Sequence, residues 1–168
     1  PLLFYKDPNK TAQYISAIFS SRSGDSYLKM YSDFKEYSEK ILIPLTYVPA
    51  VPPLDMVQQL NHAKDPIGRR FNQIAELTPL EILESYSLEE PVKAGVLNLF
   101  TMWGLSPFEA IGYLFPLYVY RMTHAALCAG GSHRLSSALH KRVVQAGGVI
   151  MDMAEVVKVT TSGGSVDG

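Results

Sequence analysis

Apolar side chains recur every three or four residues between Tyr27 and Leu42, and this spacing constrains the fold more than any other feature of the chain. Charged residues such as Lys29 and Glu36 lie between them. A repeat of about 3.6 residues places the apolar positions on one face of an α-helix. The spacing therefore predicts an amphipathic helix of about four to five turns. We expect the segment 23–25 to form a loop and helix cap before it.

Other helices can be placed from their capping residues. Asp7 stands before Pro8, which is typical of an N-cap followed by proline at the first helical position. The segments 78–81 and 106–109 both read hydroxyl, proline, apolar residue, glutamate. This is the capping-box pattern, in which the hydroxyl and the glutamate each bond to a backbone N–H at the start of a helix. Both segments therefore predict helix starts.

Prolines predict where the helices stop. Those at positions 44, 49, 52 and 53 should end the long helix and mark an extended connector. A second helical block should begin near Leu54 and break at Asp65-Pro66. Residues 1–127 are therefore expected to be mostly helical.

The sequence changes character after residue 127. The segment 129–132 predicts a turn, because its glycine pair, Gly130 and Gly131, permits positive φ. The segment 132–146 predicts a helix with Leu135, Leu139 and Val143 buried, ended by two glycines.

The last part of the chain predicts β-structure. The segments 149–151 and 156–159 are rich in β-branched residues and predict strands, and 162–164 predicts a tight turn. A hairpin cut inside its second strand leads us to expect an internal piece of a longer protein.

Charge and cysteine usage exclude several classes of function. The chain has 15 Lys and Arg against 16 Asp and Glu, a net charge of −1. Such a balance indicates no nucleic-acid partner. The single cysteine, Cys128, excludes an internal disulfide, and the four histidines show no metal-ligand spacing, so no metal is expected. No segment approaches the roughly 20 apolar residues that span a bilayer.

The segment 130–159 resembles one known family. It contains a glycine pair, Leu135, Ala138-Leu139, a second glycine pair and Val156, and it resembles the pattern G-G-x-x-x-L-x-x-A-L…G-G-x-I…x-V-x-x-I. This pattern is similar to that of the phytoene desaturase-type flavoproteins, which include carotenoid desaturases, carotenoid isomerases and retinol saturases. The segments 4–8 and 103–107 carry a weaker resemblance to the same family.

The resemblance implies a fold class and a division of the chain. The fold class is an α+β fragment, mostly helical, in which a partial helical substrate-binding domain (1–127) leads through a helix and strand (128–168) back into a Rossmann-like FAD-binding domain. FAD is the implied cofactor. Val156 would present its backbone to the adenine, and Gly130 and Gly131 would lie near the cofactor. The glycine loop that holds the FAD pyrophosphate in this family is missing, so the stretch by itself is expected to be inactive.

Aromatic residues between 100 and 120 could line a channel for a long apolar substrate, or could simply pack in the core. The candidate substrate-binding residues are Trp103, Phe108, Tyr113, Phe115 and Tyr118.

The resemblance implies an FAD-dependent oxidoreductase that exchanges a hydride between flavin and an apolar polyene or lipid-like substrate. A flavin-dependent amine oxidase and a non-enzymatic helical lipid- or partner-binding module are the alternatives. No catalytic residue can be assigned. The expected partners are an apolar small molecule and the rest of the same chain. We expect the protein in the cytoplasm or peripheral to a membrane.

Overall fold

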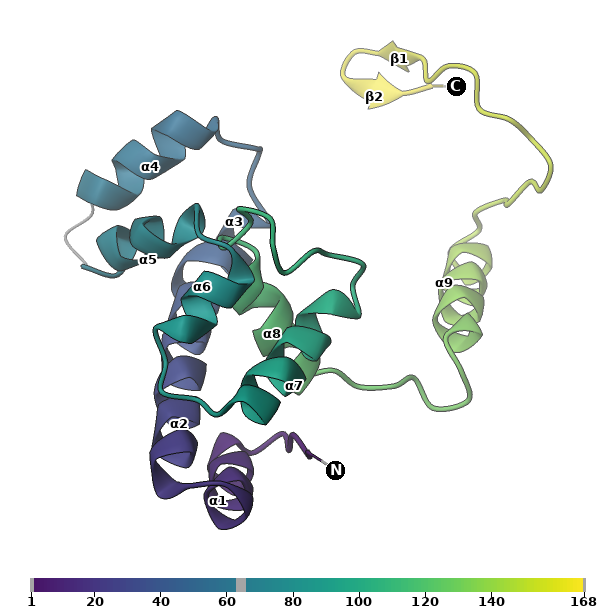
Figure 1. The fold of residues 1–168 in the computed structure, drawn as a ribbon. Coiled ribbons are helices and arrows are strands. Elements are labelled where there is room, and N and C mark those ends of the chain that lie inside the picture. Colours follow the sequence, from purple (N-terminus) through teal and green to yellow (C-terminus); the bar gives the residue numbers. More distant parts are fainter. Residues whose placement is uncertain (1, 63–65, 168) are drawn as a thin grey trace. The chain divides into compact units, whose positions relative to one another are not determined.

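The computed structural model describes residues 2–62 and 66–167 (Figure 1). It divides into two compact units, residues 1–125 and 126–168, and each is described by itself. The elements of the first unit are α1 (Pro8–Ile18), α2 (Ser21–Tyr37), a π-helix η1 (Ser38–Leu42), α3 (Ile43–Leu45), α4 (Pro53–His62), α5 (Ile67–Ala75), α6 (Pro79–Glu84), α7 (Glu90–Thr101) and α8 (Phe115–Thr123). Those of the second are α9 (His133–Gln145), β1 (Thr161–Ser162) and β2 (Ser165–Val166).

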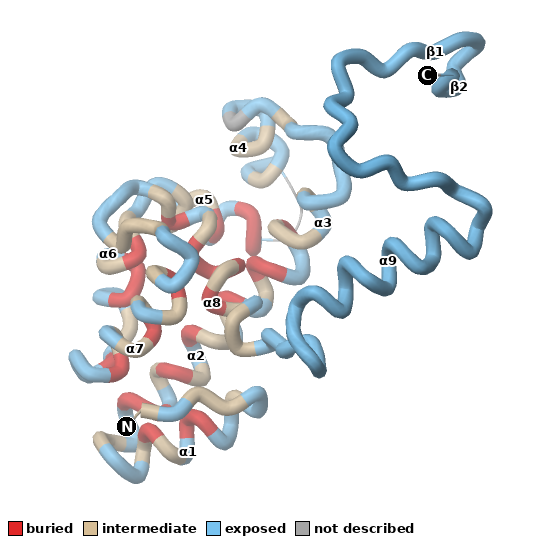
Figure 2. The backbone as a smooth tube through the Cα atoms, turned by 90° about the vertical axis from the view of Figure 1, so that its right-hand side faces the viewer, coloured by how far each residue is buried: buried red, intermediate tan, exposed pale blue. Residues whose placement is uncertain are grey.

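The core of the first unit is built around α2, whose buried face meets α1 and α8. Figure 2 shows the buried residues of this unit gathered toward its centre. Phe115 lies at the middle, with its ring 5.2 Å from Phe34 and 5.2 Å from Phe100, both edge-to-face. Such aromatic pairs stabilise a core by about 0.5–1.5 kcal/mol each beyond the area they bury. The amphipathic helix expected over 27–42 is confirmed as α2 and η1.

The loop expected at 23–25 is wrong. The helix begins at Ser21, and Ser20 is its N-cap, because the Ser20 side chain accepts a hydrogen bond from the Ser23 backbone N–H. Gly24 is buried inside the helix and allows close packing on α1. A Cβ at this position would lie 2.7 Å from the carbonyl oxygen of Ala12. The glycine thus marks a close approach of two helices and not a turn.

The two capping-box patterns have different outcomes. Thr78 and Glu81 form the complete box at the start of α6. No helix follows Ser106, whose hydroxyl instead accepts from the Phe108 backbone N–H in a local turn. This segment and the residues after it bond to a distant part of the chain, since the Pro107 carbonyl accepts from the Leu80 N–H and the Gly112 N–H donates to the Leu77 carbonyl. These long-range bonds replace the helix that the local pattern predicts.

The helix ends of the second unit agree with the sequence. Gly130 and Gly131 have φ values of 84° and 97° in the turn before α9. Gly147 has a φ of 82°, its N–H donates to the Val144 carbonyl, and the next N–H donates to the Val143 carbonyl. This is the Schellman pattern of a glycine-terminated helix.

The expected burial and strands of the second unit are wrong. All of α9 is exposed, with Leu139 at 59% exposure and Leu135 and Val143 also exposed, and the described elements of this unit make no extensive contact with it. The segments 149–151 and 156–159 form no strand. The tight turn at 162–164 is confirmed. It joins β1 to β2, which pair antiparallel over only two residues each.

The predicted fold class is therefore wrong. The described residues form a small, mostly helical structure whose sheet has two strands, and no Rossmann-like fold is visible in them. Short β-branched segments gain a strand conformation from neighbouring strands, and the described part of this unit offers none beyond the hairpin. In the described part of the chain, no helix has the length and apolar character needed to cross a membrane.

Candidate functional site

The π-helix η1 is the least common element of the fold and lies inside one continuous helix that runs from α2 through α3. Proline at position 44 lacks an N–H and crowds the carbonyl four residues earlier. The chain accommodates it by widening the preceding turn, so that the Ile43 N–H donates to the carbonyl of Ser38, five residues back. Pro44 therefore does not stop the helix as the sequence predicts, whereas residues 46–52 do form a non-helical connector. Single π-turns occur often at functional sites.

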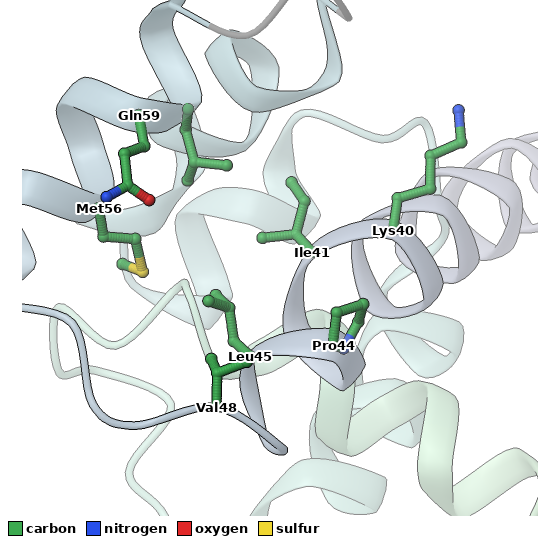
Figure 3. A pocket seen from close by; sticks show the side chains of 8 residues that line it. Lys40, Ile41, Pro44, Leu45, Val48, Met56 and Gln59 are labelled. Atoms are coloured by element: carbon green, nitrogen blue, oxygen red, sulfur yellow. The ribbon is translucent and has the colours of Figure 1, made fainter.

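An apolar pocket opens between this widened turn and α4 (Figure 3). Its volume is about 200 Å³. The floor includes Ile41, which is buried, and the side chains of Leu45 and Met56 face the same space in Figure 3. The described residues that line it are Lys40, Ile41, Pro44, Leu45, Val48, Met56, Gln59 and Leu60.

The charged groups beside the pocket are paired with one another. Glu36 accepts from Lys40 Nζ at 2.8 Å and from Arg70 Nη2 at 2.7 Å. The hydrogen bond from Lys40, followed by that from Arg70, holds the pKa of the Glu36 carboxyl below its usual range. Lys40 therefore offers its aliphatic stem to the pocket while its ammonium is held by the carboxylate.

A polar cluster of Tyr31, Glu39, Tyr120 and His124 joins α2, η1 and α8 in the first unit. Tyr120 donates its phenolic hydrogen to Glu39 Oε1. His124 Nδ1 lies 2.8 Å from the Tyr120 carbonyl, which can only accept, so Nδ1 carries the hydrogen. The Nε2 lone pair then accepts from the Tyr31 hydroxyl at 3.3 Å.

Both phenols of this cluster are held in the protonated form. Desolvation, followed by the hydrogen bond to Glu39, raises the pKa of Tyr120 well above its usual value. Desolvation and then the Glu39 charge raise the pKa of Tyr31. The cluster can hold protons at fixed positions. The sequence alone does not reveal it, because Tyr31 and His124 are 93 residues apart. Tyr120 and His124, spaced by four, are its only local signal.

The predicted substrate-binding residues do not share one site. Phe115 is fully buried in the core, Tyr118 packs against Trp103, and Trp103 is half-exposed. Phe108 is 74% exposed, and Tyr113 is also exposed. None of the five lines the pocket beside η1. Their binding role stays a prediction.

The predicted cofactor residues all lie in the second unit. Gly130 and Gly131 adopt positive φ, and a Cβ on Gly130 would lie 2.9 Å from Nε of Arg134. Val156 is 77% exposed in an extended segment, and no hydrogen bond joins its backbone to any described residue. A backbone with both polar groups free is what an adenine contact requires. Within residues 2–62 and 66–167, no group of three or more His, Cys, Asp or Glu side chains could hold a metal ion.

A bacterial relative is similar over nearly the whole chain. It is a subunit of limonene dehydrogenase from Castellaniella defragrans, and it is 35% identical over 164 residues, which are 96% of this chain. The match covers 29% of the relative, so the chain spans less than a third of the length of that protein. No model of a protein family matches the chain, and no solved structure matches it.

Proposed function

We propose that the chain is part of an FAD-dependent oxidoreductase that acts on an apolar, lipid-like small molecule. The observation that carries this proposal is the 35% identity to a dehydrogenase subunit whose named substrate, limonene, is a hydrocarbon. The resemblance of residues 130–159 to phytoene desaturase-type flavoproteins supports the same reaction class. Both likenesses favour a substrate that offers few polar groups.

One position of this chain, Val156, has backbone groups that could bind the adenine part of a flavin nucleotide. The Val156 backbone N–H and carbonyl are free among the described residues and exposed, so they can donate to and accept from an adenine edge. Positive φ at Gly130 and Gly131 favours glycine, so neither position adds a side chain to the turn that starts α9. When bound, FAD supplies a ring that accepts or returns a hydride. This chain would bind its adenine through backbone groups and exclude water from the substrate through apolar walls.

The test uses the full-length protein, purified together with any companion chain. We expect a bound flavin, seen in its visible absorbance spectrum, and anaerobic bleaching of that spectrum when limonene is added. Protein that folds but carries no flavin after reconstitution with FAD would contradict the proposal.

Two variants at one position separate a backbone contact from a side-chain contact. Val156→Pro removes the N–H that would donate to the adenine, while Val156→Ala keeps it and removes most of the exposed side chain. We expect flavin occupancy to fall at least fivefold in the proline variant and to stay unchanged in the alanine variant. Equal occupancy in both would remove Val156 from the cofactor site.

A further inference from the structure

We propose that the pocket between η1, α3 and α4 binds one small, uncharged ring hydrocarbon. The site is separate from the aromatic residues that the sequence suggested for the substrate, because none of Trp103, Phe108, Tyr113, Phe115 and Tyr118 contributes to its lining. That this ligand is the substrate rests on the proposed function. The binding itself follows from size, polarity and charge.

The volume of the pocket limits the size of the ligand. An apolar protein cavity of about 150 Å³ takes up benzene, whereas sites for drug-sized ligands measure about 300–1,000 Å³. The pocket, at about 200 Å³, lies just above the first value. It therefore suits one six-membered ring with short substituents, whereas most of a long polyene would lie outside it.

The lining favours an uncharged ligand. Ile41, Leu45 and Met56 present only carbon and sulfur, and the thioether of methionine adapts to irregular shapes. Pro44 adds a ring without an N–H, so the proline that forces the π-turn also removes one polar group from the wall. The pocket therefore offers no hydrogen-bond partner along this side.

Two polar side chains reach the pocket, and neither leaves a charge facing it. The Lys40 ammonium lies 2.8 Å from Glu36 Oε1, and Figure 3 shows it pointing away from Ile41 and Leu45. Gln59 is exposed at the rim and is neutral. An anionic ligand would have to compete with Glu36 for Lys40, and a cationic one would find no carboxylate among the described residues of the lining.

The experiment follows the methyl signals of the methionines by NMR while the protein is titrated with limonene as the probe. We expect the Met56 methyl to shift in a saturable way. The methyls of Met30 in the core and Met102 on the surface serve as internal controls and should not shift. β-Carotene in the same detergent should leave Met56 unchanged. A folded protein whose Met56 does not respond to limonene, or responds equally to β-carotene, overturns the proposal.

Matched variants test the position of the site. Val48→Trp places a large ring at the mouth and should weaken limonene binding at least tenfold, read from the Met56 signal. Leu54→Trp adds the same ring on α4, at an exposed position outside the lining, and should leave binding unchanged. If Val48→Trp does not fold, Gln59→Trp at the exposed rim takes its place. Equal weakening by pocket and control variants overturns the site.

The two proposals can fail separately. Flavin binding and its bleaching by limonene test the reaction class in the full-length protein, whereas the Met56 shift needs no cofactor. A protein that turns over limonene with the same KM in the wild type and in Val48→Trp would keep the function and exclude this pocket. A saturable Met56 shift in a folded full-length protein that takes up no flavin on reconstitution with FAD would keep the pocket and exclude the function.

Discussion

Ser38, the first residue of the widened turn η1, carries a buried hydroxyl whose effect on stability can be tested. Its side chain is fully buried, and its hydroxyl has no hydrogen-bond partner among the described residues. A buried polar group without a partner costs about 1–3 kcal/mol, and alanine is also the better helix former. We expect Ser38→Ala to increase the free energy of unfolding by about 1 kcal/mol, measured by urea denaturation. A decrease would show that the hydroxyl has a bound partner, such as a buried water molecule or a ligand.

Tyr27 makes the stability of the first unit depend on pH in the alkaline range. Desolvation by burial raises the pKa of its phenol from the usual 10.0 to about 12. The folded state thus binds the proton more tightly than the unfolded state, so the stability is intact below about pH 10 and is lost as the pH rises toward about 12. At pH 11 this loss amounts to about 1 kcal/mol.

The test compares two tyrosine variants. Tyr27→Phe should reduce the loss of stability between about pH 9 and 11, followed by urea denaturation at each pH. Tyr47→Phe is the control, because Tyr47 is 84% exposed, and it should leave the pH dependence as in the wild type. Identical pH profiles for all three proteins would mean that Tyr27 ionises as easily in the folded state as in the unfolded chain.

Among the elements, α6 allows a direct comparison of two capping patterns of the same form, at 78–81 and 106–109. Thr78 caps a real helix, and the loss of such a cap costs about 0.5–2 kcal/mol. We expect Thr78→Ala to lower the free energy of unfolding by about 1 kcal/mol. Ser106→Ala should cost less than half as much, because its hydroxyl accepts one local bond and no helix follows. Equal losses in the two variants would contradict the assignment.

The two capping patterns, at Thr78 and Ser106, also show which elements can be predicted from the sequence and which cannot. Local patterns identified the long helix, the caps at Asp7 and Thr78 and the glycine end of α9, because these depend on neighbours within a few residues. The turn after Ser106 depends on bonds to Leu77 and Leu80, which no local pattern contains. The break expected at Asp65-Pro66 involves Asp65, which lies outside the described residues.

The candidate site was less predictable than the elements for the same reason. The pocket needs a π-turn and a helix separated from it by the 46–52 connector, and the polar cluster needs Tyr31 beside His124. The aromatic run between 100 and 120 gave a plausible composition for a channel but not its arrangement. Aromatic side chains pack a core as readily as they line a pocket, and Phe115 does the former.

For the whole molecule, the residues of the hydrophobic core cluster all lie within the first unit. A chain that ends after Ala125 therefore keeps the full cluster. We expect it to unfold in one cooperative transition, with a urea midpoint equal to that of the same transition in the 168-residue chain. Circular dichroism at a helical wavelength follows both proteins. Loss of the cooperative transition on removing residues 126–168 would show that the second unit contributes to the core.

The π-turn also affects how the sequence of this chain aligns with the sequences of homologous chains. A widened turn takes up one extra residue in an otherwise regular helix, so the residues after it keep the faces that they would have without that extra residue. Removing Lys40 together with Pro44→Ala should restore a regular helix in which Leu45 stays on the face that it now shares with Ile41 at the pocket. A homologous chain without a proline at this position should accordingly align with a one-residue gap between Ser38 and Leu42. Such a gap, found in a sequence alone, would mark a protein that lacks this π-turn.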